Sequence, residues 1–343
     1  MENKIEAIGQ PEVSILKLAK GNPFEFKAKV AVLPEVRLPD YKKIALEVKR
    51  NKILVEDGEV EEALSWLQKS RARFSQKSGP CVIGDWVELR LKIKGESLSE
   101  PEIKDGFILG QGKLIPGLEE KIEGMLAGQE KRFSLSLPQN YFREDLAGEK
   151  ADFEVNLQSV QKVELPEVND NFAQGLGDFR DLAAFKKSLK DGINLEKEAA
   201  ESQRVRQKIL EKIAEKSEME TPAVLINNVK AQMLVNLKQD VSQKLGISFE
   251  TYLQKLNKTE KDLLDSFVIE AEKRVRNSLV LGEISKKEKI EVSDGEVKEE
   301  MDKFLKNIAP EKLKELDSER LRNYTEDVIK NEKTLKFLES FSQ

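Results

Sequence analysis

The stretch KLIPGLEEKIEGMLAGQEKRFSLSLP, Lys113 to Pro138, has the layout of a binding site: a turn, a short helix, a second turn and a strand. It contains no histidine or cysteine, and the whole chain has no histidine and one cysteine, Cys81. Ser–His and Cys–His nucleophile pairs, and zinc sites built on histidine or cysteine, are therefore excluded. The centre of the stretch, residues 115–118 (IPGL), is apolar and offers no group for proton transfer.

Composition narrows the class of protein. The 343 residues allow two or three domains, and 39% hydrophobic residues suffice for an ordinary core. Charged residues reach 35% and aromatic residues 6%, a balance that favours long, solvated helices. The net charge of −5 comes from interspersed charges of both signs, without the basic stripe of a nucleic-acid binder, so we expect no DNA or RNA partner.

The same features favour the cytoplasm. One cysteine cannot form an internal disulfide, which favours a reducing compartment. The first ten residues, MENKIEAIGQ, lack the apolar core of a secretory signal, and no apolar run approaches the ~20 residues that span a membrane. We therefore expect a cytoplasmic protein with no membrane partner.

The first of four predicted segments, residues 1–45, is a β-hairpin. VSILKL is one strand, and FEFKAKVAV, which alternates apolar and charged residues, is the other. The residues expected on one face of the second strand are Phe24, Phe26, Ala28, Val30 and Val32. A lone hairpin is marginally stable in water, so it needs a surface to lie against.

The second segment, residues 46–78, is a predicted linker helix. Its helical pattern covers residues 55–76, with Asp57 as the candidate N-cap and basic residues in the last turn. Its apolar side includes Phe74, and SQKSGP ends it.

The third segment, residues 79–162, is predicted to be a small antiparallel sheet curled around one short helix. DWVELRLKI, KRFSLSLP and ADFEVNLQSV each alternate as strands. The short helix is expected over Leu118–Leu126, ended by Gly128. This sheet positions the apolar turn at residues 115–118.

The fourth segment, residues 163–343, is helical almost throughout, so the predicted fold class is α+β and multidomain. Pro222 is expected in the first turn of one helix, after Thr221, and Ser293 with Glu296 has capping-box spacing at another. One apolar ridge has members four residues apart: Leu225, Val229, Met233, Leu237 and Val241.

Longer motifs show a family resemblance. LGQGKLIPGLEEKIEGMLAGQEKRFSLSLPQNYF followed by ADFEVNLQSV resembles the FK506-binding-protein class of peptidyl-prolyl isomerase. The whole chain resembles the trigger factor family of bacterial nascent-chain chaperones. IGQPEVSILKLAKGNPFEFKAKVAVLPEVRLPDYKKI is similar to the end of its N-terminal domain, and ELPEVNDNFAQGLGDF to the junction into its helical domain. KTEKDLLDSFVIEAEKRVRNSLVLGEISKKEKIEVSDGEV is similar to the helical arms.

The resemblance implies a domain for each segment. Residues 1–45 correspond to a β-rich remnant of the N-terminal ribosome-binding domain, 46–78 to the linker, and 79–162 to the prolyl isomerase-like domain. Residues 163–343 correspond to an extended all-α chaperone domain with arms.

An apolar site can catalyse prolyl isomerisation without an acid or base. Rotation about a peptide C–N bond meets a barrier of roughly 18–20 kcal/mol because the bond has partial double-bond character. That character separates charge, so a pocket that holds the prolyl ring and excludes water lowers the cost of a twisted amide. Cis and trans X–Pro bonds differ by only about 0.5–1 kcal/mol, so the assistance is purely kinetic. No proton moves, which agrees with a chain without histidine.

The resemblance assigns the prolyl pocket to seven residues: Leu91, Phe107, Leu114, Ile115, Leu118, Tyr141 and Phe153. It implies that the Ile115 N–H bonds a substrate carbonyl and that Leu118 lies beneath the proline ring. Phe153 forms a wall, and the Tyr141 hydroxyl is a polar handle. The family usually has aromatic residues at the positions of Leu91 and Leu118. Leucine still excludes water but lacks a flat ring, so we expect weakened isomerase activity.

The resemblance also implies partners. The helical domain forms a cradle for unfolded or nascent polypeptides, and the expected client contacts are Leu225, Val229, Met233 and Leu237. No cofactor is expected, because GQGKLIPG lacks the Gly-Lys-Ser/Thr ending of a phosphate-binding loop. The family docks on the ribosome through a Gly-Phe-Arg-x-Gly-Lys-x-Pro loop that this sequence lacks, so ribosome docking is not expected of this chain.

Other interpretations stay open. Core residues of any small β domain would also include Leu91, Phe107, Ile115 and Phe153, and Tyr141 also suits an ordinary half-buried tyrosine. The ridge over Met233–Val241 also suits helix packing. The isomerase-like domain could be a non-catalytic peptide-binding module. A periplasmic folding factor of related helical build is a third possibility, which the lack of a signal sequence disfavours.

Overall fold

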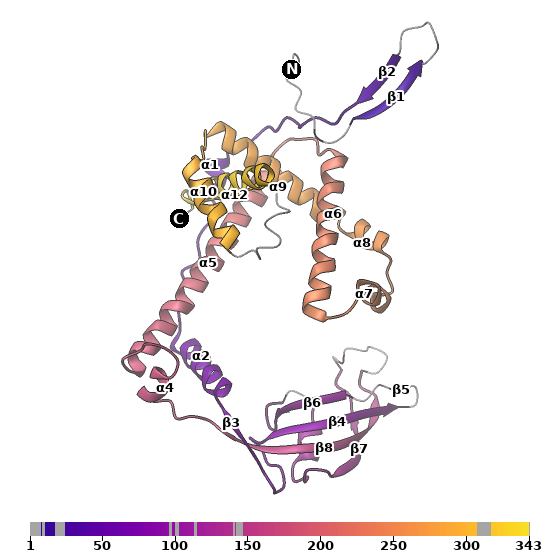
Figure 1. The fold of residues 1–343 in the computed structure, drawn as a ribbon, viewed down its shortest axis with the longest axis vertical. Coiled ribbons are helices and arrows are strands. Elements are labelled where there is room, and N and C mark those ends of the chain that lie inside the picture. Colours follow the sequence, from indigo (N-terminus) through magenta and orange to yellow (C-terminus); the bar gives the residue numbers. More distant parts are fainter. Residues whose placement is uncertain are drawn as a thin grey trace. The chain divides into compact units, whose positions relative to one another are not determined.

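The computed structural model describes residues 8, 11–17, 25–95, 98–99, 103–112, 115–139, 141, 147–306 and 317–342. The chain divides into two compact units. Unit 1 contains residues 1–53 and 196–343, and unit 2 contains residues 54–195. Figure 1 shows unit 1 as mainly helical, whereas unit 2 holds the large sheet. The observed class is α+β with antiparallel sheets, as predicted.

The sheet of unit 2 is built around one long strand, β8 (Lys150–Glu164). Strand β8 pairs antiparallel with β3 (Arg73–Gln76), β4 (Trp86–Gly95) and β7 (Glu130–Ser136). Strand β4 in turn pairs with β5 (Leu98–Ser99) and β6 (Ile103–Ile108), and Figure 1 shows β4 and β8 running side by side. The three strands predicted from alternation are therefore confirmed.

The linker helix is shorter than predicted. Helix α2 spans Asp57–Ser70, and Glu56 is its N-cap in a capping box with Glu59. Residues 73–76, expected as the helix end, form strand β3 instead, because residues 161–164 of β8 offer them backbone hydrogen-bonding partners. Phe74 accordingly packs edge-on against Trp86, with ring centroids 5.6 Å apart.

The core of unit 2 follows the alternation of β8. Ala151, Phe153, Val155 and Leu157 are all buried, at two-residue spacing. Gln158 is an extra residue opposite β4, because Glu88 pairs with Ser159 while Leu89 pairs with Leu157. Because of this bulge, the Val160 side chain points into the core again, and Val160 is 1% exposed.

A short helix, α3 (Leu118–Ile122), packs on this core through its two buried end residues. It ends earlier than predicted, because Gly124 adopts a left-handed φ of 85° and turns the chain before Gly128.

A second cluster in unit 2 joins α2 to α4 (Asp170–Gln174) and the start of α5 (Leu182–Lys216). Its buried members are Leu64, Phe172, Ala173 and Phe185.

Unit 1 contains most of the helices. These are α1 (Tyr41–Leu46), the rest of α5, α6 (Ala223–Asp240), α7 (Phe249–Leu256), α8 (Glu260–Ser266), α9 (Val268–Lys287), α10 (Asp294–Lys306) and α12 (Ser318–Glu339). A π-helical turn, η2 (Val241–Leu245), extends α6. Pro222 is the N-cap of α6, one position before the predicted first turn. The capping box of Ser293 and Glu296 is confirmed, with the Ser293 N–H donating to Glu296 at 2.9 Å.

Helix α1 belongs to the core of unit 1. Tyr41, Ile44 and Ala45 are at most 4% exposed and join a cluster with residues of α5, α9 and α12. The Tyr41 hydroxyl donates a hydrogen bond to the Glu288 carboxylate, and Lys42 Nζ lies 2.9 Å from the same carboxylate. Among the described residues, no helix combines the length and apolar character needed to cross a lipid bilayer.

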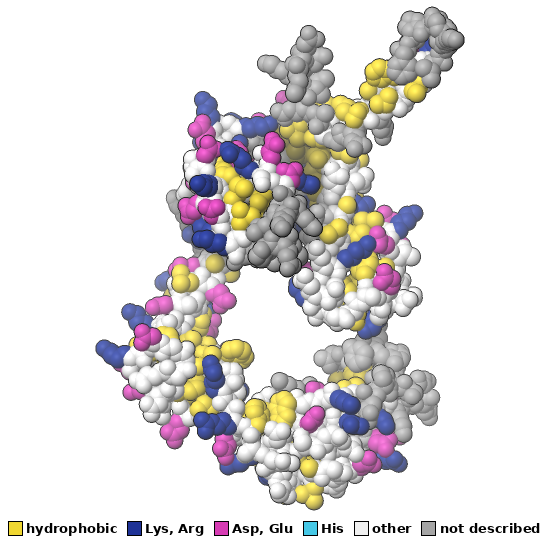
Figure 2. Space-filling view, in the orientation of Figure 1, with side chains coloured by type: hydrophobic (Ala, Val, Ile, Leu, Met, Phe, Trp, Pro, Cys, Tyr) yellow, Lys and Arg dark blue, Asp and Glu magenta, His cyan; other side chains and the backbone are white. Residues whose placement is uncertain are grey.

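The predicted hairpin is confirmed as β1 (Glu12–Lys17) paired with β2 (Glu25–Lys29). Val13 pairs with Ala28, and Ile15 with Phe26, so these four residues share one apolar face. Figure 2 shows hydrophobic side chains gathered on the hairpin, where Ile15 is 59% and Phe26 55% exposed. Of the other residues predicted on this face, Phe24 lies outside the described residues, and Val30 and Val32 follow the end of β2.

We predict that Tyr41→Phe destabilises unit 1 in a pH-dependent way. Burial first, and then the hydrogen bond to Glu288, raise the pKa of Tyr41 from 10.0 to about 12. A pKa raised by folding gives stability that is fully present below the unfolded pKa and is lost as pH rises through the folded pKa. Tyr41→Phe should lower the free energy of unfolding by roughly 1.5–3 kcal/mol near neutral pH. This difference from the wild type should shrink between pH 10 and about 12.

Urea unfolding followed by circular dichroism measures both effects. Tyr324→Phe is the matched control, because Tyr324 is 65% exposed in the same unit. The assigned hydrogen bond would be contradicted if Tyr41→Phe and the wild type differed by the same free energy of unfolding across this pH range.

Candidate active site

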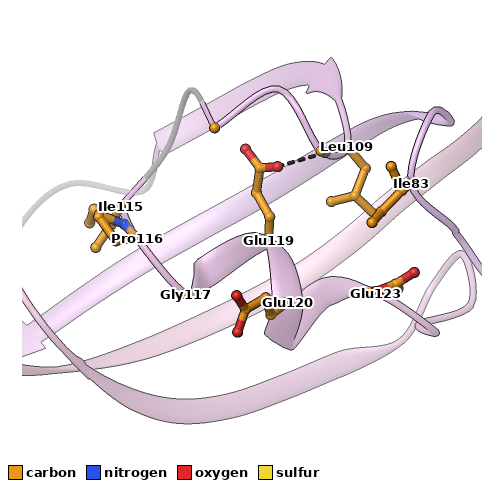
Figure 3. Close-up of a pocket in the computed structure, with 10 residues that line it drawn as sticks. Ile83, Leu109, Ile115, Pro116, Gly117, Glu119, Glu120 and Glu123 are labelled. Atoms are coloured by element: carbon orange, nitrogen blue, oxygen red, sulfur yellow. Dashed lines mark hydrogen bonds between the residues drawn. The ribbon is translucent and has the colours of Figure 1, made fainter.

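The turn before α3 places neighbouring side chains in different surroundings. Gly117 has a left-handed φ of 83°, which favours glycine, and the Leu118 N–H donates to the Ile115 carbonyl at 3.0 Å. Leu118 consequently points into the core and is 0% exposed, whereas Ile115 is half-buried and Pro116 is exposed. Figure 3 shows Ile115, Pro116 and Gly117 at the start of this short helix.

The structure brings most of the predicted pocket residues into one cluster. Its fully buried members from the predicted set, each at most 5% exposed, are Leu91, Phe107, Leu118 and Phe153. Ile115 and Tyr141 are partly buried and pack against this cluster. Leu114 lies outside the described residues.

The buried members occupy neighbouring strands. Leu91 of β4 pairs with Val155 of β8, and the next inward pair along is Ile93 with Phe153. Phe153 stacks on Phe133 of β7, with centroids 5.9 Å apart and rings 11° from parallel. Sequence reasoning missed Phe133, although the alternation of KRFSLSLP places it on the same face as Leu135.

Phe133 and Phe153 also line a cavity of about 400 Å³ at strands β7 and β8. The other residues that line it are Arg132, Ser134, Asp152 and Glu154. Phe153 itself is 1% exposed, so its side chain belongs to the core.

A separate cavity of about 390 Å³ lies beside the turn of residues 115–117. Ile115 belongs both to its lining and to the predicted pocket. The rest of its wall combines apolar residues with the carboxylates of α3 and the residue that follows it, as Figure 3 shows. Sequence reasoning did not predict this cavity, because GLEEKIEG has the pattern of an ordinary acidic helix start.

A nearby turn is fixed by a buried carboxylate. Asp85, 4% exposed, accepts hydrogen bonds from Lys77 Nζ at 2.5 Å and from the Val82 N–H at 2.9 Å. Beside it, Cys81 is fully buried, and burial raises the pKa of its thiol, which donates to the Ile122 carbonyl. The protonated, enclosed thiol is unsuited to nucleophilic attack.

The cluster can exclude water from a group bound against it. Its walls are aliphatic and aromatic side chains, and its partly buried edge includes Ile115 and Tyr141 together with Phe133 and Leu135. Within the part of the chain that the structure describes, no three Cys, Asp or Glu side chains are arranged to hold a metal ion.

The predicted client contacts lie along α6. Leu225, Val229, Met233 and Leu237 are all half-buried. Two residues near them are buried: Leu234 is 7% exposed, and Val241, the last residue of the predicted ridge, is 2% exposed at the start of η2. The four predicted residues therefore lie at the margin between helix packing and solvent.

Three family models match the chain in succession. One described as bacterial trigger factor protein matches residues 1–67, and one described as FKBP-type peptidyl-prolyl cis-trans isomerase matches residues 92–158. A third, described as bacterial trigger factor protein C-terminus, matches residues 181–340. The chain thus contains an FKBP-type isomerase domain between two trigger factor segments.

Curated relatives match over nearly the whole chain. Trigger factor of Caldicellulosiruptor saccharolyticus is 33% identical over 342 residues, covering 98% of this chain and 77% of the relative. Trigger factor of Geobacillus thermodenitrificans is 35% identical over 344 residues, covering 98% and 79%. A solved structure of the trigger factor chaperone matches with 19% identity and a TM-score of 0.48, over 98% of this chain and 80% of that one. The chain belongs to the trigger factor family.

Proposed function

We propose that this chain is a folding chaperone that holds unfolded or nascent polypeptides and catalyses cis–trans isomerisation of X–Pro bonds. The observation that supports it most is the FKBP-type match over residues 92–158 together with an apolar cluster behind the turn of residues 115–117. The trigger factor matches on either side support the chaperone part.

The proposed catalysis needs water exclusion and one hydrogen bond. A prolyl ring rests against Ile115 and Tyr141, two of the half-buried residues at the edge of the cluster. Phe153 and Leu118 support this surface from behind, and the Ile115 N–H holds a substrate carbonyl. Removing water from the amide weakens its charge-separated planar form, which lowers the rotational barrier of roughly 18–20 kcal/mol. No proton or cofactor takes part.

The proposed isomerase activity is weaker than that of a site lined by aromatic side chains. Leucine occupies positions 91 and 118, and both side chains are buried, at 5% and 0% exposure. They exclude water from behind the surface but present no flat ring for the proline. The burial of Leu118 also favours a second candidate function, a peptide-binding lobe without turnover.

The proposed helical cradle acts through weak contacts. Half-buried apolar residues such as Val229 and Met233 expose part of their surface beside charged neighbours. Contacts of this kind bind many sequences and release them quickly, which suits a chaperone without ATP.

We predict that Leu118→Ala lowers isomerase turnover more than a core substitution of equal severity does. Leu118 and Leu157 are both 0% exposed in the same cluster, so each alanine variant should lose about 2–5 kcal/mol of unfolding free energy. A protease-coupled assay on a proline peptide, run where both variants are folded, measures turnover. Only Leu118→Ala should reduce kcat/KM.

The wild-type rate decides between the two candidate functions. A rate no faster than the uncatalysed reaction supports the peptide-binding lobe and rejects catalysis. Equal kcat/KM in both variants would reject the role of Leu118 in supporting the prolyl surface.

We predict that the chain suppresses aggregation of a diluted, denatured client at near-stoichiometric ratios, measured by light scattering. The double variant Val229→Ser, Met233→Ser should need more chaperone for the same suppression, because it loses apolar contact area. Asn228→Ser is the control, since Asn228 is exposed on the same helix. Scattering that rises unchanged with the wild type rejects the chaperone function.

A further inference from the structure

The chain passes between the two units twice, and the two connections differ in kind. The division falls between residues 53 and 54 and again between residues 195 and 196. The second connection lies inside α5, a continuous helix. The first is a loop, because residues 49–56 have no regular secondary structure. A loop without tertiary contacts adds little stiffness to a connection that a helix already makes.

This loop is fixed to α5 within unit 1. The Asn51 backbone N–H donates to the Glu201 carboxylate at 2.7 Å, and the Asn51 side-chain amide donates to the same carboxylate at 3.2 Å. Arg204, three residues further along α5, donates to the Lys49 carbonyl at 3.1 Å. The two residues that hold the loop therefore come from the same turn of α5.

The Glu201 carboxylate is oriented by Arg204. The guanidinium donates to both carboxylate oxygens, at 2.8 and 2.7 Å, in a fork that fixes the two side chains together. The hydrogen bonds from Arg204 first, and then that from the Asn51 N–H, lower the pKa of Glu201 to about 2, so the carboxylate stays charged at neutral pH. The Glu201 side chain is only 10% exposed. A carboxylate with several donors and little contact with water binds more firmly than an isolated surface ion pair.

The middle residue of this stretch, Arg50, is held by a second carboxylate. It pairs with Glu339, the last residue of α12. The Glu339 side chain also accepts hydrogen bonds from Ser202 and Arg206 of α5, both at 2.5 Å. Residues 49–51, which we call the strap, are thus bonded at three successive positions to two helices of unit 1.

The chain that follows the strap is fixed to α5 inside unit 2 as well. Lys186 Nζ lies 2.6 Å from the Glu61 carboxylate, and Lys190 Nζ lies 3.1 Å from that of Asp57. Helices α2 and α5 also share the apolar cluster that contains Leu64. The loop between α1 and α2 is therefore anchored to α5 near both of its ends.

We propose that the strap is a conformational lock: its bonds to Glu201, Arg204 and Glu339 restrict how far unit 2 moves relative to unit 1. With the strap bound, two anchored chain segments connect the units, and together they resist bending and twisting. With the strap released, α5 alone carries the connection, and movement between units is the ordinary expectation for domains joined in this way. Neither the proposed chaperone function nor the proposed isomerase function is needed for this lock to exist.

Limited proteolysis of the full chain tests whether these bonds hold the strap. Trypsin cleaves after lysine and arginine, so an opened strap offers cleavage sites at positions 49, 50 and 52. Glu201→Ala removes the acceptor of Asn51 and the partner of Arg204. Cleavage at these sites should become about tenfold faster, because it follows the opened fraction and the variant loses hydrogen bonds to a charged group.

A second variant and a control complete this experiment. Asn51→Asp places a carboxylate against Glu201 and leaves α5 unchanged, so like-charge repulsion should open the strap to the same degree. Glu211→Ala is the matched control, because Glu211 is a half-buried carboxylate on the same helix that pairs with Lys273 instead. This control should be cleaved at the wild-type rate.

Distances between the units test the consequence of opening. Asn228→Cys in unit 1 and Lys150→Cys in unit 2 provide two exposed sites for spin labels, whereas the native Cys81 is fully buried. Pulsed electron resonance should report a broader distribution of label distances when Glu201→Ala or Asn51→Asp is added to this pair.

Two results overturn the proposal. Strap variants that are cleaved no faster than Glu211→Ala would show that these bonds do not hold the strap. An unchanged distance distribution in variants whose strap is cleaved faster would show that α5 alone sets the movement between the units.

Discussion

Burial of one face of strand β8 is the constraint on which unit 2 depends. This strand pairs with three others, and its inward residues at 151, 153, 155, 157 and 160 form the centre of the core. A one-residue slip would turn every inward side chain outward, so the register is strongly fixed. The bulge at Gln158 is part of this constraint, because Val160 would otherwise face solvent. The turn of residues 115–117 is held in place because α3 packs on this core.

Local sequence patterns predicted the strands but not how they combine. ADFEVNLQSV alternates clearly, so most of β8 was predictable, whereas its extension to Glu164 depends on pairing with Arg73 some ninety residues earlier. The segment RFSQ has no strand pattern of its own and follows a strong helix, so it was predicted as helix. Tertiary pairing overrides local preference in such a segment. Helix α3 ends before Gly124 rather than before Gly128. Both glycines adopt a left-handed φ, and sequence alone does not show that the helix already ends at the first of them.

The candidate site was predictable only in part. A resemblance identified the apolar residues, and the structure gathers those it describes into one cluster. Exposure was not predictable, because the patterns that mark a pocket wall also mark a core: Leu118 is fully buried, while Ile115 three residues earlier is accessible. The acidic cavity was missed for a related reason. Its walls come from residues 83, 109, 110, 112, 115–117, 119, 120 and 123, and no single segment shows that they converge.

Unit 1 is stabilised by ion pairs as well as by its apolar cluster. Arg206 of α5 forms ion pairs with Glu332 and Glu339 of α12, the latter at 2.5 Å. Burial pushes the pKa of Glu339 upward, but hydrogen bonds from Ser202 and Arg206 outweigh it and hold the pKa below its usual value. Partly buried pairs of this kind are strongly orientation-dependent, so they fix how α5 meets α12 without adding apolar area. Under the proposed chaperone function, the half-buried apolar residues of α6 keep part of their surface available to a client, because side chains fully used in packing cannot also contact one.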